Sequence, residues 1–181
     1  IVTESNNHFT RTKAIAKLLK NRSFGEILEV VDSIKIVDDA ADTIRELKRK
    51  GYICGIISDS YDVVTNHLKN KLKMDFSVAN ELEFSKGICT VEVKIPSFIF
   101  GSQASLCKHR VCKTNALMSI LGKYNIKREN CITIGDSIND LCMIKESGLG
   151  IAFCSNDELV NHYADLIISR PSFSELLLVI K

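Results

Sequence analysis

The sequence predicts an α/β protein in which a parallel sheet has helices on both faces. Continuous apolar runs with the length of buried strands occur at residues 52–57, 131–135, 150–153 and 166–168. Helical patterns separate these runs, so that strand and helix alternate from residue 34 onward. Such alternation is typical of a parallel sheet, and continuous apolar strands are typical of strands that are buried on both faces.

The first 33 residues predict two helices and no strand. An apolar stripe runs along residues 8–20 at helical spacing. Ser23 followed three residues later by Glu26 forms a capping-box pattern at the start of a second helix. We therefore expect residues 1–33 to form a small helical cap segment and residues 34–181 to form the α/β core.

The remaining elements follow in order within the core. Residues 38–50 predict an amphipathic helix with basic residues near its C-terminal end, and Gly51 is suited to the C-cap. Apolar residues alternate around Lys86-Gly87, which predicts a β-hairpin over residues 81–100. Further helices are expected at 62–72, at 113–124, at 141–147, from 157 and from 174. A short strand is expected at 76–80.

Composition excludes several classes of function. A net charge of +2 without a basic block argues against nucleic-acid binding. No apolar run approaches the roughly 20 residues of a membrane span, and the first residues lack the pattern of a signal peptide. We therefore expect a cytoplasmic protein that does not bind membranes.

The cysteines and histidines give little sign of a metal site in the sequence. The seven cysteines are scattered and contain no C-x-x-C pair, which favours reduced structural thiols and makes a zinc site improbable. Cys112 is expected to be an ordinary thiol. The histidines show no partner at ligand spacing and are expected at the surface; they are His8, His67, His109 and His162.

Three polar features follow strands or begin helices and carry the chemistry. Ser58 follows the apolar run 52–57, Lys113 begins a helix, and Asp136 and Asp140 follow the apolar run 131–135. Ligands bind at the carboxyl ends of parallel strands. A hydroxyl and an ammonium suit phosphoryl oxygens, and paired carboxylates suit Mg²⁺. The alternative is that the two acids only cap the following helix, because capping acids are common.

This order of features resembles the haloacid dehalogenase superfamily of phosphohydrolases, and within it the phosphoserine phosphatase-like branch. Three motifs carry the resemblance, namely Ile56-Ile57-Ser58, Lys113, and Gly135-Asp136-Ser137-Ile138-Asn139-Asp140. It implies a Rossmann-like parallel sheet with a small helical cap and a hairpin. It also implies Mg²⁺-dependent hydrolysis of a small-molecule phosphomonoester through an aspartyl-phosphate.

The resemblance also implies a role for each matching residue. Ser58 would hydrogen-bond a phosphoryl oxygen, and Lys113 would neutralise phosphate charge and pair with the acids. Asp136 would ligate Mg²⁺, and Asp140 would orient Lys113 or a water on the metal. Asn139 would lie near the phosphate.

The sequence departs from the family pattern in two ways. No Asp-x-Asp motif, which would supply the nucleophile on the central strand, occurs in the 181 residues. We expect this motif in a segment outside this sequence. Without the strand that carries it, two neighbouring strands should each have an edge without a partner. The alternative is that the motif was lost naturally in an inactive relative that still binds phosphate. Asp59 stands where the branch usually has Gly, and Ser58-Asp59-Ser60 leaves open a phosphotransferase with an alcohol acceptor. Without a matching cap arginine, phosphoserine is one candidate substrate among phosphomonoesters.

Overall fold

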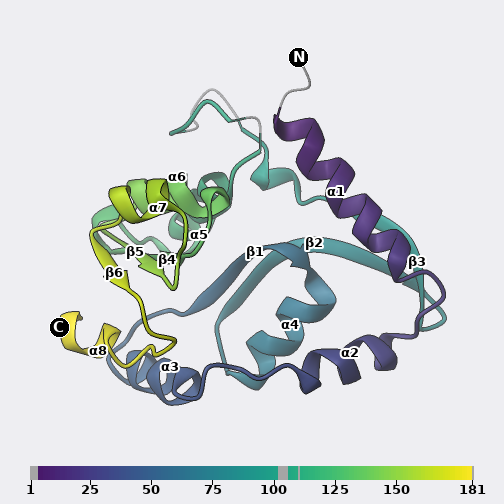
Figure 1. Ribbon diagram of the computed structural model, residues 1–181, viewed down its shortest axis with the longest axis horizontal. Helices are drawn as coiled ribbons and strands as arrows, with labels where there is room; N and C mark the ends of the chain where they lie inside the picture. The colour runs from purple at the N-terminus through teal and green to yellow at the C-terminus, as the bar shows by residue number, and fades with distance from the viewer. Residues whose placement is uncertain (1–3, 102–105, 110, 181) are drawn as a thin grey trace. The chain divides into compact units, whose positions relative to one another are not determined.

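The chain forms two compact units, Ile1–Pro96 and Ser97–Lys181. Their elements are labelled in Figure 1, a ribbon diagram of the computed structural model. The structure describes residues 4–101, 106–109 and 111–180. Each unit contains a three-stranded open sheet with helices packed on it, and the predicted α/β class with parallel strands is confirmed.

The sheet of the first unit has the order β1-β2-β3 and mixes both kinds of pairing. β1 (Gly55–Tyr61) runs parallel to β2 (Phe76–Ser85), which runs antiparallel to β3 (Ile88–Lys94). The first half of β2 pairs with β1 and its second half pairs with β3. The predicted short strand 76–80 and the first strand of the predicted hairpin are therefore one continuous strand.

A two-residue turn at Lys86-Gly87 joins β2 to β3 and confirms the predicted hairpin. Both residues have positive φ angles, 51° for Lys86 and 79° for Gly87. Positive φ at both central positions is the requirement of a type I′ turn, whose twist matches that of the flanking strands. Ser85 and Ile88 consequently face each other as the last pair of the ladder. β3 ends at Lys94, and residues Ser97–Ile99 form a 3₁₀ turn.

In the described part of the first unit, residues 4–96, the helices are α1 (Glu4–Leu18), α2 (Phe24–Ser33), α3 (Ala40–Arg49) and α4 (Asp62–Lys71). The predicted capping box is present, because Ser23 Oγ accepts the amide of Glu26 at 3.1 Å and the Glu26 carboxylate accepts the amide of Ser23 at 2.7 Å. α4 packs on β1 and β2, α1 packs on β3, and α2 packs on α4. Their shared core is formed by Ala16, Ile27, Tyr61, Val63, Leu82 and Cys89.

The first sheet strand differs from its prediction at both ends. The apolar run 52–57 predicts a strand that stops before Ser58, whereas β1 begins at Gly55 and continues to Tyr61. It begins late because the amide of Cys54 donates to Asp75 Oδ2 at 2.9 Å, just before β2 starts. It continues because β2 also runs on, and Tyr61 pairs with Asn80 after an irregularity that follows Ile57.

The second unit contains an all-parallel sheet of order β4-β5-β6. Its strands lie within a residue or two of their predicted positions, and its helices α5, α6 and α7 follow the predicted alternation. The strands are β4 (Ile132–Gly135), β5 (Leu149–Phe153) and β6 (Leu166–Ile168), and the helices are α5 (Lys113–Tyr124), α6 (Leu141–Glu146), α7 (Glu158–Tyr163) and α8 (Leu176–Val179). α6 packs on β4 and β5, and α7 packs on β5. Ile144, Ala152 and Val160 form the buried cluster beneath these helices.

Four strands, β1, β3, β4 and β6, have a partner on one side only within the described part of the chain, and β1 and β4 are the two for which an open edge was expected. β1 pairs with β2 alone, and β4 pairs with β5 alone, so both expected open edges are present. The predicted division into a cap segment, 1–33, and a core, 34–181, stays a prediction. Among the helices that the structure describes, none combines the length and apolar character needed to cross a bilayer.

Candidate functional site

The loop after β4 is organised around Asp140. The strand stops at Gly135, and a 3₁₀ turn over Ile138–Asp140 leads directly into α6. Asp140 is buried, with 5% of its surface exposed. Its Oδ2 accepts the amides of Asp136 (3.3 Å) and Ser137 (3.4 Å) and the hydroxyl of Ser137 (3.2 Å). These hydrogen bonds let a buried carboxylate stay charged.

Gly135 is required by this arrangement. A Cβ atom at position 135 would lie 2.3 Å from Asp140 Cβ and 2.6 Å from its Cγ. Such distances are well inside van der Waals contact, so any side chain there would displace the carboxylate. The glycine in the motif therefore lets the loop fold back tightly onto the end of β4.

Lys113 pairs with the other oxygen of the same carboxylate. Its Nζ lies 2.7 Å from Asp140 Oδ1, and the two side chains are only 12% and 7% exposed. Lys113 is the first residue of α5, where the chain turns from the extended backbone of Cys112 into the helix. Because the pair is nearly buried, each partner fixes the position of the other.

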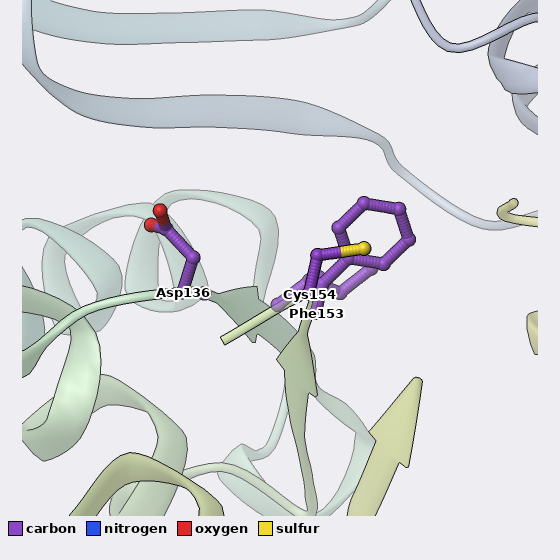
Figure 2. Close-up of a pocket in the computed structure, with 5 residues that line it drawn as sticks. Asp136, Phe153 and Cys154 are labelled. Carbon is purple, nitrogen blue, oxygen red and sulfur yellow. The ribbon is translucent and has the colours of Figure 1, made fainter. Parts of the chain in front are cut away.

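Asp136 is the exposed carboxylate of the loop. It lines an open cavity of about 310 Å³ together with Ile134, Gly135, Phe153 and Cys154. Figure 2 shows its carboxylate beyond the end of β4, pointing away from the side chains of Phe153 and Cys154. The carbonyl of Asp136 accepts the hydroxyl of Ser155 at 2.7 Å, which ties the loop to the segment after β5.

The donor set at this strand end fits a hard divalent cation. The Asp136 carboxylate receives no hydrogen bond from the described residues, so its oxygens can serve as ligands. Mg²⁺ prefers such oxygens and usually keeps several waters. Asp140 does not fit a direct ligand equally well, because both of its oxygens are already engaged. It fits the predicted role of orienting Lys113.

The structure brings together Lys113, Asp136 and Asp140 in the second unit. Asn139 lies exposed in the 3₁₀ turn of the same loop. Ser58 and Asp59 lie in the first unit, half-buried in the middle of β1. Their individual roles remain predictions.

The backbone around Ser58 and Asp59 is held by polar contacts of its own. Ser58 Oγ accepts the amide of Ser60 at 3.1 Å. The carbonyl of Asp59 accepts the side-chain amide of Asn80 at 2.7 Å, and Asn80 is only 2% exposed. This contact fixes the path of the chain directly after Ser58.

Sequence reasoning missed the residues at the end of β5. Phe153 and Cys154 complete the cavity beside Asp136, and the Phe153 ring stacks on Phe173 with centroids 4.3 Å apart. The signal was present, because β5 was predicted to end at residue 153 and neighbouring parallel strands end at the same edge of a sheet. For Cys112, burial raises the pKa of the thiol, and the expectation of an ordinary thiol stays a prediction.

Comparison with known proteins identifies the family. Residues 8–173 match the family model described as haloacid dehalogenase-like hydrolase. A phosphoserine phosphatase from Methanocaldococcus jannaschii is 32% identical over 168 residues, which cover 91% of this chain and 72% of that protein. A phosphoserine phosphatase from Archaeoglobus fulgidus is 32% identical over 91% of this chain, which spans only 45% of that protein.

A solved structure agrees with the sequence relatives. It is described as a phospho-aspartyl intermediate analogue of phosphoserine phosphatase, and it matches with a TM-score of 0.76 and 30% identity over 93% of this chain and 76% of that chain. The predicted phosphatase class is thereby confirmed at the level of the family. With its motifs, its strand-end loop and its fold all in agreement, the chain belongs to the haloacid dehalogenase-like hydrolases, in their phosphoserine phosphatase-like branch.

Proposed function

We propose that the protein is a Mg²⁺-dependent phosphomonoester hydrolase that works through an aspartyl-phosphate. The observation that carries the proposal is the buried Lys113–Asp140 pair beside the exposed carboxylate of Asp136. The arrangement offers an ammonium for phosphoryl oxygens and a carboxylate for a cation at one strand end. The nucleophile is an aspartate outside these 181 residues, as the Asp-x-Asp motif does not occur within them.

Lys113, Asp136 and Asp140 of the second unit each have a distinct role in this proposal. Lys113 holds a proton on Nζ and offsets the charge of the phosphoryl group. Asp140 keeps that ammonium in place, since the amides of the loop hold the carboxylate from the other side. Asp136 provides a ligand for Mg²⁺, which when bound neutralises charge on the phosphoryl oxygens. Ser58, Asp59 and Asn139 are the other proposed substrate-binding residues. Ser58 hydrogen-bonds a phosphoryl oxygen, and Asn139 lies near the phosphate.

The proposed substrate is a small phosphomonoester, and phosphoserine is the first candidate. The relatives from Methanocaldococcus jannaschii and Archaeoglobus fulgidus carry the name phosphoserine phosphatase. Residues 1–33 would form part of a cap over the substrate, and 34–181 the core. We place the enzyme in the cytoplasm, because its seven cysteines favour a reducing compartment.

Turnover of a generic aryl phosphate by the full-length protein tests the proposal. Activity should require Mg²⁺, and Asp136→Asn should lower kcat/KM by about 100-fold or more, the size typical of losing one preorganised electrostatic contact. Asp38→Asn is the matched control, because that carboxylate lies 81% exposed in the first unit. Phosphoserine is then compared with other phosphomonoesters.

Two results would contradict the proposal. One is an Asp136→Asn variant with the turnover of the unmodified protein. The other is full-length protein that binds inorganic phosphate in the presence of Mg²⁺ but releases none from any ester, which would identify a non-catalytic relative.

A further inference from the structure

A second group of metal-ligating side chains lies in the second unit, separate from the Asp136 carboxylate. It consists of Cys107, His109, Cys112 and Cys142, whose ligand atoms all lie within 4.8 Å of one another. The first three come from the segment that precedes α5, and Cys142 is the second residue of α6. We call these four residues the thiol cluster.

The structure departs from the sequence-based expectation for this region in one respect. His109 is exposed, as predicted, but it does have a partner at ligand spacing, because its Nδ1 lies 3.3 Å from Cys142 Sγ. The absence of a C-x-x-C pair argued against zinc, yet Cys107-x-His109-x-x-Cys112 places three ligands on one short segment. The fourth ligand was hidden because it lies 30 residues further along the chain, after β4.

The chemistry of the thiol cluster fits one class of metal. Three thiolates and one imidazole form a Cys₃His set, which binds Zn²⁺ tetrahedrally in structural sites. A Zn–S bond of about 2.3 Å places the sulfur atoms of a tetrahedron about 3.8 Å apart. The observed spread of up to 4.8 Å is therefore close to that of a bound metal, and small side-chain rotations would close the difference.

We propose that the thiol cluster is a structural zinc site, in which Cys107, His109, Cys112 and Cys142 bind one Zn²⁺. Four protein ligands fill a tetrahedral shell and leave no position for a substrate, so the metal acts on the fold and not on the reaction. Mg²⁺ does not compete for this site, because it prefers oxygen ligands.

The surroundings of the cluster support metal binding. Cys112 is buried, and Cys107 and Cys142 are half-buried. Zn²⁺ would bind them as thiolates and release their protons to solvent. Lys108 lies between two of the ligands in the sequence and would offset the single negative charge that remains.

The metal would connect the two elements that hold the Lys113–Asp140 pair. Cys112 directly precedes Lys113, and Cys142 follows Asp140 by two residues. A zinc ion bound to both cysteines would therefore fix the start of α5 against the start of α6. The site would position the ion pair without touching the substrate.

Metal analysis of the full-length protein tests the inference directly. Protein prepared with reductant and with zinc supplied, then freed of loosely bound metal by gel filtration, should contain one zinc per chain. X-ray absorption should show three sulfur neighbours at about 2.3 Å and one nitrogen at about 2.0–2.1 Å. Neither measurement depends on a variant that folds or on enzymatic turnover, so a failed phosphatase assay would leave the result intact.

Variants then assign the ligands. Cys142→Ser and His109→Ala should each weaken zinc binding by tenfold or more, measured by competition with a chromogenic chelator. Cys54→Ser and His162→Ala are the matched controls, because neither residue belongs to the thiol cluster, and they should retain one zinc per chain. Removing zinc from the unmodified protein should lower Tm.

Three outcomes would overturn the inference. The first is folded, reduced protein that holds no zinc after exposure to it. The second is a metal shell made of oxygen atoms, or zinc binding that survives in both ligand variants. The third is a disulfide between two cysteines of the thiol cluster, detected by mass spectrometry in protein produced in a reducing cytoplasm.

Discussion

The ends of β4 and β1 are built in opposite ways, although the sequence predicts a phosphate-binding residue at each. β4 stops at Gly135, and the loop after it closes around the buried carboxylate of Asp140. β1 instead continues past Ser58 to Tyr61 and loses its regular register with β2 on the way. One strand end is fixed by a buried charge, and the other by a neutral amide from Asn80.

This difference indicates how tolerant each strand end is. A buried charge needs all of its partners, because an unpaired ion in the interior is far more costly than a missing neutral hydrogen bond. The whole β4 loop should therefore lose its conformation when one of these contacts is removed. The end of β1 should lose stability gradually.

The largest expected effect comes from Asp140→Ala. Removing this carboxylate leaves the Lys113 ammonium without its 2.7 Å partner in a nearly buried position. The free energy of unfolding should fall by about 3–5 kcal/mol, measured by urea denaturation followed by circular dichroism, and phosphatase activity should be lost.

A double variant separates the two effects of that change. Lys113→Met with Asp140→Leu removes both charges, so much of the lost stability should return while activity stays absent. If Asp140→Ala alone unfolds at the same urea concentration as the unmodified protein, the loop is not organised by the buried pair.

A smaller effect on stability is expected when a glycine of β4 or of β1 is replaced by alanine, which adds one methyl group. Gly135→Ala would place Cβ 2.3 Å from Asp140 Cβ, so the loop must move and stability should fall by about 1–3 kcal/mol. Gly55→Ala, at the start of β1, would place Cβ 2.4 Å from three outer ring atoms of Phe76, which are the nearest atoms to it. That ring can rotate away, so the loss should be smaller.

Gly122→Ala is the matched control for both glycine variants. Position 122 lies within α5, and a Cβ there has no atom within 4 Å. The substitution should raise stability by about 1 kcal/mol through helix propensity. Equal losses for Gly135→Ala and Gly55→Ala would remove the proposed contrast between the strand ends.

The smallest effect concerns the start of β1 and its dependence on pH. Burial alone would raise the pKa of Asp75, but hydrogen bonds from Lys48 and from the amide of Cys54 outweigh it and lower the pKa below its ordinary value of 3.8. The ionised carboxylate therefore stabilises the fold at neutral pH, and this contribution disappears as the pH falls below about 4.

The measurement compares unfolding at pH 6 and pH 3. The unmodified protein should lose more stability between these two values than Asp75→Asn, which cannot ionise. The same pH dependence in both proteins would show that Asp75 contributes little to holding the start of β1.

Local patterns predicted most of the fold from the sequence. The capping box at Ser23 and the helix that begins at Lys113 depend on residues close together in the chain. The bounds of β1 could not be predicted in this way, because they depend on Asp75 and on the length of β2, both far along the chain. The periodicity of apolar residues indicates which secondary structure a segment prefers, and pairing with a neighbouring strand decides where a strand ends.

The same distinction applies to the site. Asp136, Asp140 and Lys113 could be found because each follows a strand or begins a helix within a recognisable motif. The geometry of the Lys113–Asp140 pair, 27 residues apart, could be anticipated only through the family resemblance. The thiol cluster needed the folded chain, since Cys142 comes from a separate element from the other three residues.

The double pairing of β2 has a consequence for how this protein can vary among its relatives. An inserted or deleted residue near the middle of β2 would shift its two ladders against each other and turn every following side chain to the opposite face of the sheet. Length changes should therefore be absent from β2 in homologous sequences. They should gather instead at the turn between β2 and β3, where an extra residue disturbs only one hairpin end.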